Sequence, residues 1–485
     1  MNPLLFTDPA FLFLFAPVVL AAYYVAPIGL RNTLLFGASL FLYTWGEQAY
    51  ILVLLTSIVI NYAGGLTISR ATKPLSKRML LATGVVLNLL LLAVFKYVPF
   101  LAQNYNAILV YLNSRPIAVP ATHLPAGLSF YTFMGISYLV DAYRSQVEPE
   151  KKFLQFGLYL SLFPHLIAGP IVRYCDIAVQ LHARHAGLHD LASGSRRFII
   201  GLGKKVLIGN TVALVVDSIM QLPQAQLTGP VALLGMACYS LQIYYDFSGY
   251  SDMAIGLARM FGFTFPENFN YPYVSRSITE FWKRWHMTLS TWLRDYLFFA
   301  LGVRGSRSRL YRNVLIVFAL CGLWHGASWH FVVWGIFQGV FLVLERIWLL
   351  KLLDRLPRFV SHVYALVVIV TGWALFRADD LPHAFAYIRS MYGAWSFSGV
   401  QTATTAYLTP QVAIGVVVGL LGCTPVLPAV NAWLARAVDR LQPRTAMLVE
   451  TVTGTIWVGG HAAVLLASLM LIAAGTYHPF IYFRF

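Results

Sequence analysis

The sequence predicts an all-α polytopic membrane protein, and three observations carry that prediction. Of its 485 residues, 58% are hydrophobic and only 11% are charged, whereas a soluble globular protein carries about 25% charged residues. Apolar runs recur along the whole chain, and a membrane-spanning helix needs about 20 mostly apolar residues. Short basic segments separate these runs. We therefore expect a single integral-membrane domain over residues 1–485.

The apolar runs begin with a segment from about Phe11 to Val25. No Lys or Arg precedes it and no small-residue cleavage site follows, so we expect a retained helix and not a cleaved signal. Further spans, some of them half-spans or re-entrant pieces, are expected to begin near Thr33, Tyr50, Met79, Leu124, Phe153, Phe198, Pro230, Val314, Ala327, Val363, Val412 and Gly454. These runs predict about eleven transmembrane helices. No internal repeat is found, which disfavours a secondary transporter.

Basic residues predict which side of the membrane each loop faces. Residues 70–78 hold four cations and no acid, so this segment is expected to be cytoplasmic, as are residues 304–312 and the less basic 351–358. Residues 104–123 and 395–409 are nearly uncharged, which is typical of translocated loops. The net charge of +16 is thus explained better by orientation and anionic lipid than by nucleic acid.

Neither the cysteines nor a histidine-rich segment predicts a metal site. The cysteines stand alone in or beside apolar runs, without metal-ligand spacing or a disulfide framework, and are expected to be small core residues: Cys175, Cys238, Cys321 and Cys423. His182, His185 and His189 lie at i, i+3 and i+7 with Asp190 adjacent, a spacing that could hold a metal on a helix. Because Gly187 interrupts this helix and the flanks are polar, a solvated amphipathic surface helix is the preferred interpretation.

The first cluster that could carry chemistry is CGLWHGASWH, residues 321–330. If its helix begins after the basic loop, His325 lies about 20 Å along it, near the middle of the membrane. Gly322 and Gly326 allow a substrate or another backbone to come close, and Trp324 and Trp329 could wall a pocket. A neutral imidazole in such a cavity suits a general base, while a structural histidine bonded to a neighbouring helix is the alternative.

The second cluster is ITEFWKRWHMTLSTWLRDYLF, residues 278–298. Its aromatic and leucine residues recur at three- and four-residue spacing, with Lys283, Arg284 and Arg294 between them. This pattern predicts an amphipathic helix that lies in the interface or dips inward. His286 is at its centre, and a solvated or lipid-facing position is the alternative to a functional one.

The third cluster is YYDFSGYSDMAIG, residues 244–256, in which Asp246, Ser248 and Asp252 fall within an apolar span. Two carboxylates six residues apart do not share a helix face, so they do not form an acid/base pair. Gly249 could break that helix. We expect a polar network that positions a neighbouring element or pairs with arginine side chains, and these residues serve as supporting positions.

Several long motifs, in order, resemble the membrane-bound O-acyltransferase family and its bacterial alginate O-acetylation branch. The resemblance is carried by Trp324-His325-Gly326, by the stretch FWKRWHMTLS, by YYDFSGYSDMAIG, by FPHLIAGPIVRY (163–174) and by PAGLSFYTFMGISYLVDAYR (125–144), and it runs over the whole chain. The family implies a ring of helices around a central funnel, with interfacial and re-entrant helices. It implies His325 as the catalytic base and His286 as a second functional position.

The resemblance also implies a reaction. An acyl group passes from cytoplasmic acetyl-CoA through the His325 site, with no metal, toward O-acetylation of a secreted or cell-surface polysaccharide. His286 or the Trp285 indole could stabilise the oxyanion. The phosphates of coenzyme A could be attracted by Arg304, Arg307, Arg309 and Arg312, although orientation in the membrane explains the same arginines.

The C-terminal tail HPFIYFRF, residues 478–485, is aromatic and too short to span a bilayer. The family resemblance suggests that Tyr482 carries the acyl group as an ester and that a separate extracytoplasmic transferase collects it. An interfacial anchor is the alternative. The expected location is the bacterial inner membrane. The rival functions are D-alanyl transfer within the same family and a polysaccharide transporter or export channel without chemistry.

Overall fold

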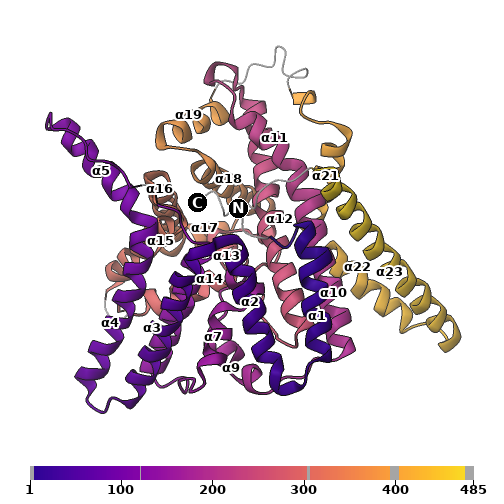
Figure 1. The fold of residues 1–485 in the computed structure, drawn as a ribbon. Helices are drawn as coiled ribbons and strands as arrows, with labels where there is room; N and C mark the ends of the chain where they lie inside the picture. Colours follow the sequence, from indigo (N-terminus) through magenta and orange to yellow (C-terminus); the bar gives the residue numbers. More distant parts are fainter. Residues whose placement is uncertain (1–4, 121, 303–305, 394–403, 476–485) are drawn as a thin grey trace.

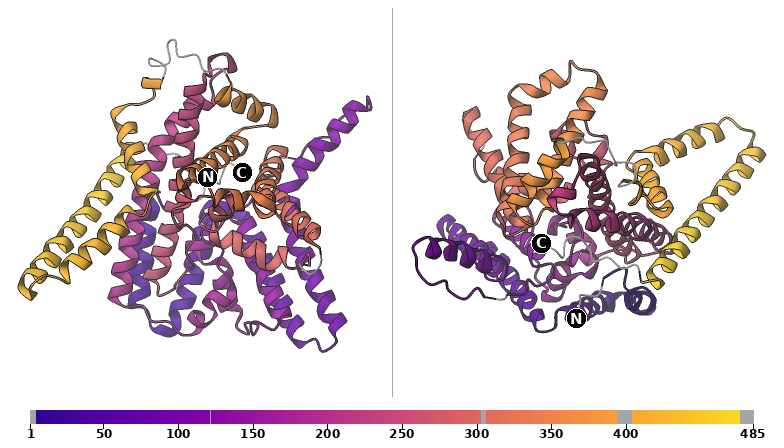
Figure 2. Two further views of the ribbon diagram at one scale, coloured as in Figure 1. Left: turned by 180° about the vertical axis from the view of Figure 1, so that it is seen from behind. Right: turned by 90° about the horizontal axis from the view of Figure 1, so that it is seen from above.

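The computed structural model describes residues 5–120, 122–302, 306–393 and 404–475. Within these ranges the chain forms helices and no β-strand, as the all-α class requires. The helices pack into one body, from which α5 (Val98–Tyr111) and α23 (Pro443–Ala473) project in different directions (Figure 1). The view from above places the N-terminal helices along one side of that body and the C-terminal helices at another (Figure 2).

The N-terminal part of the chain is a series of apolar helices joined by short turns. Their bounds are η1 Phe11–Phe15, α1 Ala16–Val25, η2 Ile28–Leu30, α2 Arg31–Glu47, η3 Gln48–Tyr50, α3 Ile51–Arg70, α4 Pro74–Leu92 and η4 Ala93–Tyr97. The turn η4 is π-helical and leads directly into α5. Such π-helical turns within α-helices occur often at functional sites.

The middle of the chain builds the buried centre. Its elements are α6 Leu128–Tyr143, α7 Phe153–Ser161, α8 Phe163–Leu166, α9 Tyr174–His182, α10 Leu188–Gly203, η5 Lys204–Gly209, α11 Asn210–Met220, η6 Gln224–Gln226 and α12 Gly229–Met260. Most of α12 is buried. The segment expected to span from Phe153 is instead a nine-residue helix that ends at Ser161, too short to cross a bilayer.

Gly249 does not break α12, which is one continuous helix. A Cβ atom on Gly249 would lie 2.7 Å from the carbonyl oxygen of Gly201, and one on Gly256 would lie 2.6 Å from that of Gly194. Both partners belong to α10, so these glycines let the two helix backbones touch. The expectation of a broken helix was wrong because a glycine in a helix also permits close packing.

The C-terminal part holds shorter and bent elements. They are η7 Pro272–Val274, α13 Ile278–Trp282, α14 Met287–Trp292, η8 Leu293–Phe298, α15 Arg307–His325, α16 Trp329–Leu344, η9 Glu345–Leu349, α17 Leu350–Leu353, α18 Arg358–Arg377, α19 Leu381–Tyr392, α21 Pro410–Gly422 and α22 Val426–Val438. The short elements α13, α14 and η8 occupy the stretch in which a single amphipathic helix was expected.

Five helical stretches are long and apolar enough to cross a membrane, namely residues 28–70, 74–111, 188–220, 358–377 and 443–473. The pair α21 and α22, bent by 60°, makes a sixth if it counts as one span. These helices agree with a multi-pass membrane protein. The expected number of about eleven is not confirmed by helix length and composition in the described ranges.

Candidate active site

His325 is the last residue of α15, and the chain leaves the helix in an extended conformation at Gly326. The helix begins at Arg307, inside the basic segment that was expected to be a loop. Its length places His325 about 27 Å from that end. His325 is buried, with 5% of its surface exposed, and its position near the middle of the membrane stays a prediction.

Glycines allow α15 and α16 to touch next to His325. A Cβ atom on Gly322 would lie 2.1 Å from the carbonyl oxygen of Phe331, and one on Gly335 would lie 2.1 Å from that of Phe318. Real Cβ contacts are never that short, so the two backbones are in direct contact. The expectation that Gly322 admits another backbone is confirmed.

Aromatic rings surround the His325 imidazole. Ring centroids lie 4.9 Å away for Trp324, 5.2 Å for Trp334 and 5.3 Å for Phe376. Trp324 is buried, whereas Trp329 is 54% exposed and lies outside this enclosure. The walls are therefore apolar, and any hydrogen bond or charge inside them acts more strongly than it would in water.

The stretch 278–298 is broken where His286 stands. His286 has φ +42° and ψ +54°, in the left-handed region, and separates α13 from α14. The break is held by backbone hydrogen bonds, because Met287 N–H donates to Asn268 O (2.9 Å) and Asn270 N–H donates to Arg284 O (2.9 Å). A continuous interfacial helix was thus the wrong expectation. Tertiary pairing outweighs the amphipathic pattern.

The break turns His286 inward. Its side chain is fully buried and Trp285 is 2% exposed, so a solvated or lipid-facing position is excluded. The ring of Phe247, from α12, meets the His286 ring edge-on with centroids 4.6 Å apart. A non-glycine residue in the left-handed region is uncommon and is found disproportionately at functional sites.

The hydrogen bonds around His286 indicate its tautomer. The N–H of Ile171 donates to Thr288 Oγ1 over 3.0 Å. The Thr288 hydroxyl in turn donates a hydrogen bond to Asn268 Oδ1, 2.9 Å away. Thr288 N–H also donates to Asn268 Oδ1, over 3.3 Å. Because that oxygen is an acceptor, His286 Nδ1, 3.1 Å from it, carries the proton. In the neutral ring, Nε2 of His286 is therefore a bare acceptor, buried without a hydrogen-bond partner among the described residues.

The structure brings the two predicted histidines together around one indole. The ring of Trp324 lies 6.3 Å from that of His286 and 4.9 Å from that of His325. Its Nε1 atom is buried and has no hydrogen-bond partner within the described part of the chain. We call His286, Trp324 and His325 the histidine site. It presents a buried N–H donor beside a buried imidazole acceptor, which suits a ligand with both a carbonyl oxygen and a hydroxyl.

Trp285 contacts a layer of aromatic rings next to the histidine site. Its ring contacts those of Phe281 (5.5 Å), Phe269 (5.1 Å) and Trp373 (4.9 Å). Trp373 in turn stacks on Trp334, with centroids 6.5 Å apart, and Trp334 contacts His325. Trp285 therefore supports the wall of the histidine site from behind.

The acidic residues of α12 form ion pairs with α10 and η5. Asp246 pairs with Lys205 at 2.9 Å, and Asp252 pairs with Arg197 at 2.9 Å and with Lys204 at 2.6 Å. The expected network is confirmed in these contacts. Ser248 is buried, and its hydroxyl has no hydrogen-bond partner among the described residues.

Several supporting residues were missed by sequence reasoning. Asn268, whose Nδ2 donates to Ser251 Oγ over 3.1 Å, lies in a loop without a recognisable pattern. Phe247 looked like an ordinary core residue. Lys96 was overlooked, although a lysine inside an apolar run is a signal that could have been used.

The remaining expected positions lie away from the histidine site or outside the described residues. Arg307, Arg309 and Arg312 are exposed at the beginning of α15, roughly 20 to 27 Å from its other end by helix rise. Arg304 and the whole tail 478–485 with Tyr482 lie outside the described residues.

The histidine-rich segment is not one helix. His182 ends α9 and His189 belongs to α10, with an irregular connection between them. His182 Nε2 pairs with Glu150 Oε2 at 2.8 Å. No group of three or more His, Cys, Asp or Glu residues in the described ranges could hold a metal ion.

Cys175 differs from the other cysteines. It is exposed, whereas Cys238, Cys321 and Cys423 are buried. The buried face of α9 consists of Tyr174, Ile177 and Leu181, which leaves Cys175 on the opposite face. The expectation of a core residue was therefore wrong for this cysteine alone.

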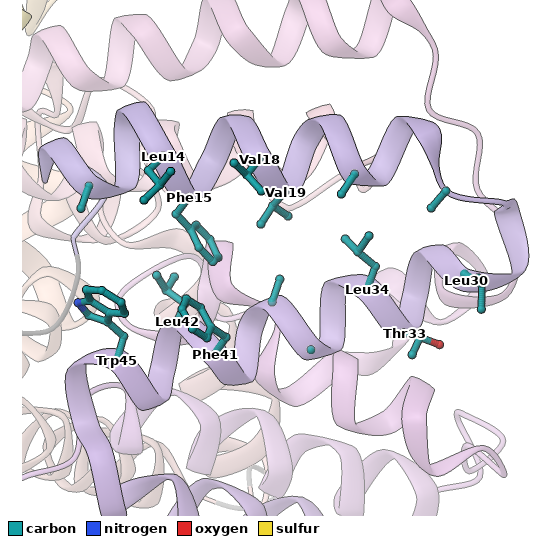
Figure 3. Close-up of a pocket in the computed structure, with 15 residues that line it drawn as sticks. Leu14, Phe15, Val18, Val19, Leu30, Thr33, Leu34, Phe41, Leu42 and Trp45 are labelled. Carbon is teal, nitrogen blue, oxygen red and sulfur yellow. The ribbon is translucent and has the colours of Figure 1, made fainter.

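A separate groove of about 740 Å³ lies between α1 and α2 (Figure 3). Its walls include Leu14, Phe15, Val18 and Phe41, and no titratable side chain lines it. Such a lining suits hydrocarbon and offers no group for acyl transfer. This groove therefore holds no candidate catalytic group.

Comparison with known proteins identifies a family. Residues 41–366 match the family model described as MBOAT, membrane-bound O-acyltransferase family. A probable alginate O-acetylase AlgI of Azotobacter vinelandii is 38% identical over 99% of this chain and 100% of its own length. A peptidoglycan O-acetyltransferase of Helicobacter pylori is 34% identical over 80% of each chain. A teichoic acid D-alanyltransferase of Bacillus subtilis is 30% identical over 44% of this chain and 57% of its own length.

Proposed function

Because this chain belongs to the membrane-bound O-acyltransferase family, we propose that it passes acetyl groups from cytoplasmic acetyl-CoA across the membrane for O-acetylation of a polysaccharide. An alginate-like secreted polymer is the first candidate, supported by the names of relatives that match almost the full length. Peptidoglycan follows, supported by the Helicobacter pylori relative, and cellulose is a further candidate. The proposed setting is the bacterial inner membrane, with about eleven helices ringing a central funnel and residues 1–485 forming one domain.

The observation that carries this proposal is the histidine site. In the proposed reaction, the oxygen of an acceptor hydroxyl forms a bond to the thioester carbonyl carbon, and the carbon–sulfur bond of acetyl-CoA breaks. His325 takes the hydroxyl proton as general base and returns it to the departing thiolate. A buried imidazole reached from both sides of the membrane would let donor and acceptor meet without either crossing.

The oxyanion requires a hydrogen-bond donor. Neutral His286 has a bare Nε2 atom and cannot donate from it, and Trp285 lies behind the wall. The indole N–H of Trp324, buried and without a hydrogen-bond partner in the described ranges, fits this role better than either residue named from the sequence. His286 then serves as a second acceptor that orients the hydroxyl.

Tyr482 is the proposed acceptor hydroxyl. A phenol loses its proton more readily than an alcohol, and its ester is a good donor for a second transfer, so a covalent relay would divide the reaction into two steps. A separate extracytoplasmic transferase would then move the acetyl group to the polymer. The cations Arg304, Arg307, Arg309 and Arg312 would attract the phosphates of coenzyme A on the cytoplasmic side.

The proposal is tested with purified protein in lipid vesicles and radiolabelled acetyl-CoA. His325→Ala should lower acetyl turnover by about 100- to 10,000-fold, the usual contribution of a general base. The matched control is His189→Ala, because His189 is exposed on α10 and should leave turnover unchanged. Full turnover in His325→Ala would refute the base assignment.

The acyl carrier has its own test. Mass spectrometry of the C-terminal peptide after incubation with acetyl-CoA should find an acetyl group on Tyr482, and Tyr482→Phe should abolish it. Persistent absence of the adduct under trapping conditions would leave the tail as an interfacial anchor.

One alternative is favoured by a specific observation. The Bacillus subtilis relative is named a teichoic acid D-alanyltransferase, so the donor could carry D-alanine. That relative covers less than half of this chain, whereas the acetyl-transferring relatives cover most of it. Supplying D-alanyl and acetyl thioesters in the same vesicle assay distinguishes the two, and turnover of neither would favour a non-catalytic export channel.

A further inference from the structure

Lys96 is a buried cation inside an apolar helical stretch. It lies in the π-helical turn η4, within the stretch 74–111 that is long and apolar enough to span a membrane. Its side chain is 8% exposed. An ionisable group at such a position is costly, and for that reason it usually has a function.

The ammonium group of Lys96 binds the end of the helix that carries His325. Its Nζ atom donates to the carbonyl oxygen of Trp324, lies 3.3 Å from that of His325, and lies 3.5 Å from Ser129 Oγ. The hydroxyl of Tyr97 donates to the carbonyl oxygen of Leu323 over 3.1 Å. Two consecutive residues of η4 thus bind the last three carbonyls of α15.

The final carbonyls of an α-helix have no partner within the helix and carry the negative end of its dipole. A lysine ammonium satisfies both the hydrogen bonds and the charge. In the described part of the chain, the Lys96 ammonium group faces the end of α15, the Ser129 hydroxyl and the Trp324 ring, whose centroid is 5.8 Å from Nζ.

The charge of Lys96 also reaches the imidazole. Lys96 and His286 both act electrostatically on His325, and the Lys96 ammonium group lies 3.3 Å from the carbonyl oxygen of His325. A protonated amine disfavours a second positive charge nearby. Lys96 therefore opposes formation of the imidazolium and favours the neutral ring that a base requires.

We propose that Lys96 is a positioning residue of the histidine site, which holds the last turn of α15 so that His325 points into the site as a neutral imidazole. This inference rests on the proposed function only for its link to turnover, because the contacts themselves do not depend on the reaction. It differs from simple helix capping in one respect, since capping alone would not alter the protonation of His325.

The test compares Lys96→Gln and Lys96→Met with Tyr97→Phe. Lys96→Gln keeps hydrogen-bond donors but removes the charge, Lys96→Met removes both, and Tyr97→Phe removes one cap from the same helix end without changing charge. We expect acetyl-CoA turnover to fall by roughly 10- to 100-fold in Lys96→Met, as for other residues that orient a functional side chain. Tyr97→Phe should change it by less than about threefold, the cost of one neutral hydrogen bond.

The pH dependence of turnover distinguishes a residue that acts on His325 through its charge from a residue that only caps α15. Turnover in Lys96→Gln should be lost at a higher pH than in the native protein, because removing a nearby cation favours the imidazolium. Tyr97→Phe should keep the native pH profile. Native turnover and an unchanged profile in both Lys96 variants would overturn the proposal.

A readout that needs no turnover keeps this inference separate from the proposed function. Nitrogen-15 NMR of labelled histidines, with the His325 signals identified from a His325→Ala sample, reports protonation directly. Lys96→Gln should protonate His325 at higher pH than the native protein, and identical titrations would overturn the proposal. An inactive native protein with a shifted titration would count against the proposed function alone. Lys96→Gln is the variant to use if size-exclusion chromatography shows that Lys96→Met does not fold.

Discussion

Asn268 shows how one side chain can decide the chemistry of another. Its Oδ1 atom accepts from the hydroxyl and N–H of Thr288 and from His286 Nδ1. The Asn268 amide cannot be flipped, because its NH2 group would then face the N–H of Thr288, and two donors would meet. The amide therefore keeps the proton of His286 on Nδ1 and leaves Nε2 bare.

Replacement of Asn268 tests this arrangement at the level of single atoms. Asn268→Asp has the same shape and retains an acceptor oxygen, so acetyl-CoA turnover should stay within about tenfold of the native value. Asn268→Leu removes the acceptor and frees the imidazole to change tautomer, which should lower turnover by roughly 100-fold. Both variants are measured in the vesicle assay after size-exclusion chromatography confirms folded protein. A folded leucine variant with native turnover would contradict the tautomer argument.

At the scale of elements, the site depends on where helices stop. The α13 helix starts against Glu345, whose two carboxylate oxygens accept from Ile278 N–H (2.6 Å) and Thr279 N–H (2.8 Å). The helix α15 ends at His325, where its last carbonyl groups bind the ammonium group of Lys96. Contacts with distant parts of the chain thus fix the start of α13 at Ile278 and the end of α15 at His325. His286 stands at the start of α14, where Met287 N–H is held by the Asn268 carbonyl oxygen.

The close contact between α15 and α16 yields a prediction about stability and activity together. Gly322→Ala places a Cβ atom 2.1 Å from the Phe331 carbonyl, so the helices must separate. Overpacking of this kind costs about 1 to 3 kcal/mol, and it should also displace His325 and reduce turnover. Thermal unfolding and the vesicle assay measure the two effects.

The matched control for that variant is Gly454→Ala, since Gly454 lies in α23 with nothing within 4 Å of an added Cβ. It should leave turnover unchanged and raise helix stability slightly, by up to about 1 kcal/mol. Native stability and turnover in Gly322→Ala would contradict the direct backbone contact between α15 and α16.

The difference between these elements explains what sequence could predict. Helices such as α3, expected from near Tyr50 and found at Ile51–Arg70, follow from local apolarity alone. The break at His286 could not be predicted, because Trp282, Trp285 and Leu289 continue the helical spacing across it. It is imposed by pairing with Asn268 and Asn270, and nothing in the local pattern indicates that pairing. His325 was found as a polar residue in an apolar stretch, and His286 was found through the family resemblance, whereas the tautomer of His286 required the three-dimensional structure.

At the scale of the whole molecule, orientation follows from charge. The basic connection between α3 and α4 is expected to be cytoplasmic, and it lies at the same end of the molecule as α9 (Figure 1). Residues 307–312, also basic, begin the helix that leads to His325. If both basic segments face the cytoplasm, His325 is approached from that side along α15, which is the direction that a cytoplasmic acyl donor requires.

Cys175 tests this orientation, because it is exposed on α9 while the other three cysteines are buried. A membrane-impermeant maleimide should label Cys175 in inside-out vesicles and not in right-side-out vesicles. Although Cys175 is exposed, the surrounding protein partly desolvates its thiol, and this effect, with a smaller contribution from the Asp176 carboxylate, raises the pKa of the thiol to about 11. Because the thiolate is the reactive form, labelling should be roughly 100-fold faster at pH 9 than at pH 7, the tenfold-per-unit rise expected below the pKa.

The control for that experiment is Cys175→Ser, which should abolish labelling in native membranes and leave acetyl-CoA turnover unchanged. Labelling of the native protein from the right-side-out face would invert the assigned topology. The basic segments would then lie outside, against the positive-inside rule, and His325 would be reached along α15 from the compartment of the acceptor and not from that of the donor. The side of the membrane on which the Cys175 thiol reacts therefore tests the proposed direction of acetyl transfer.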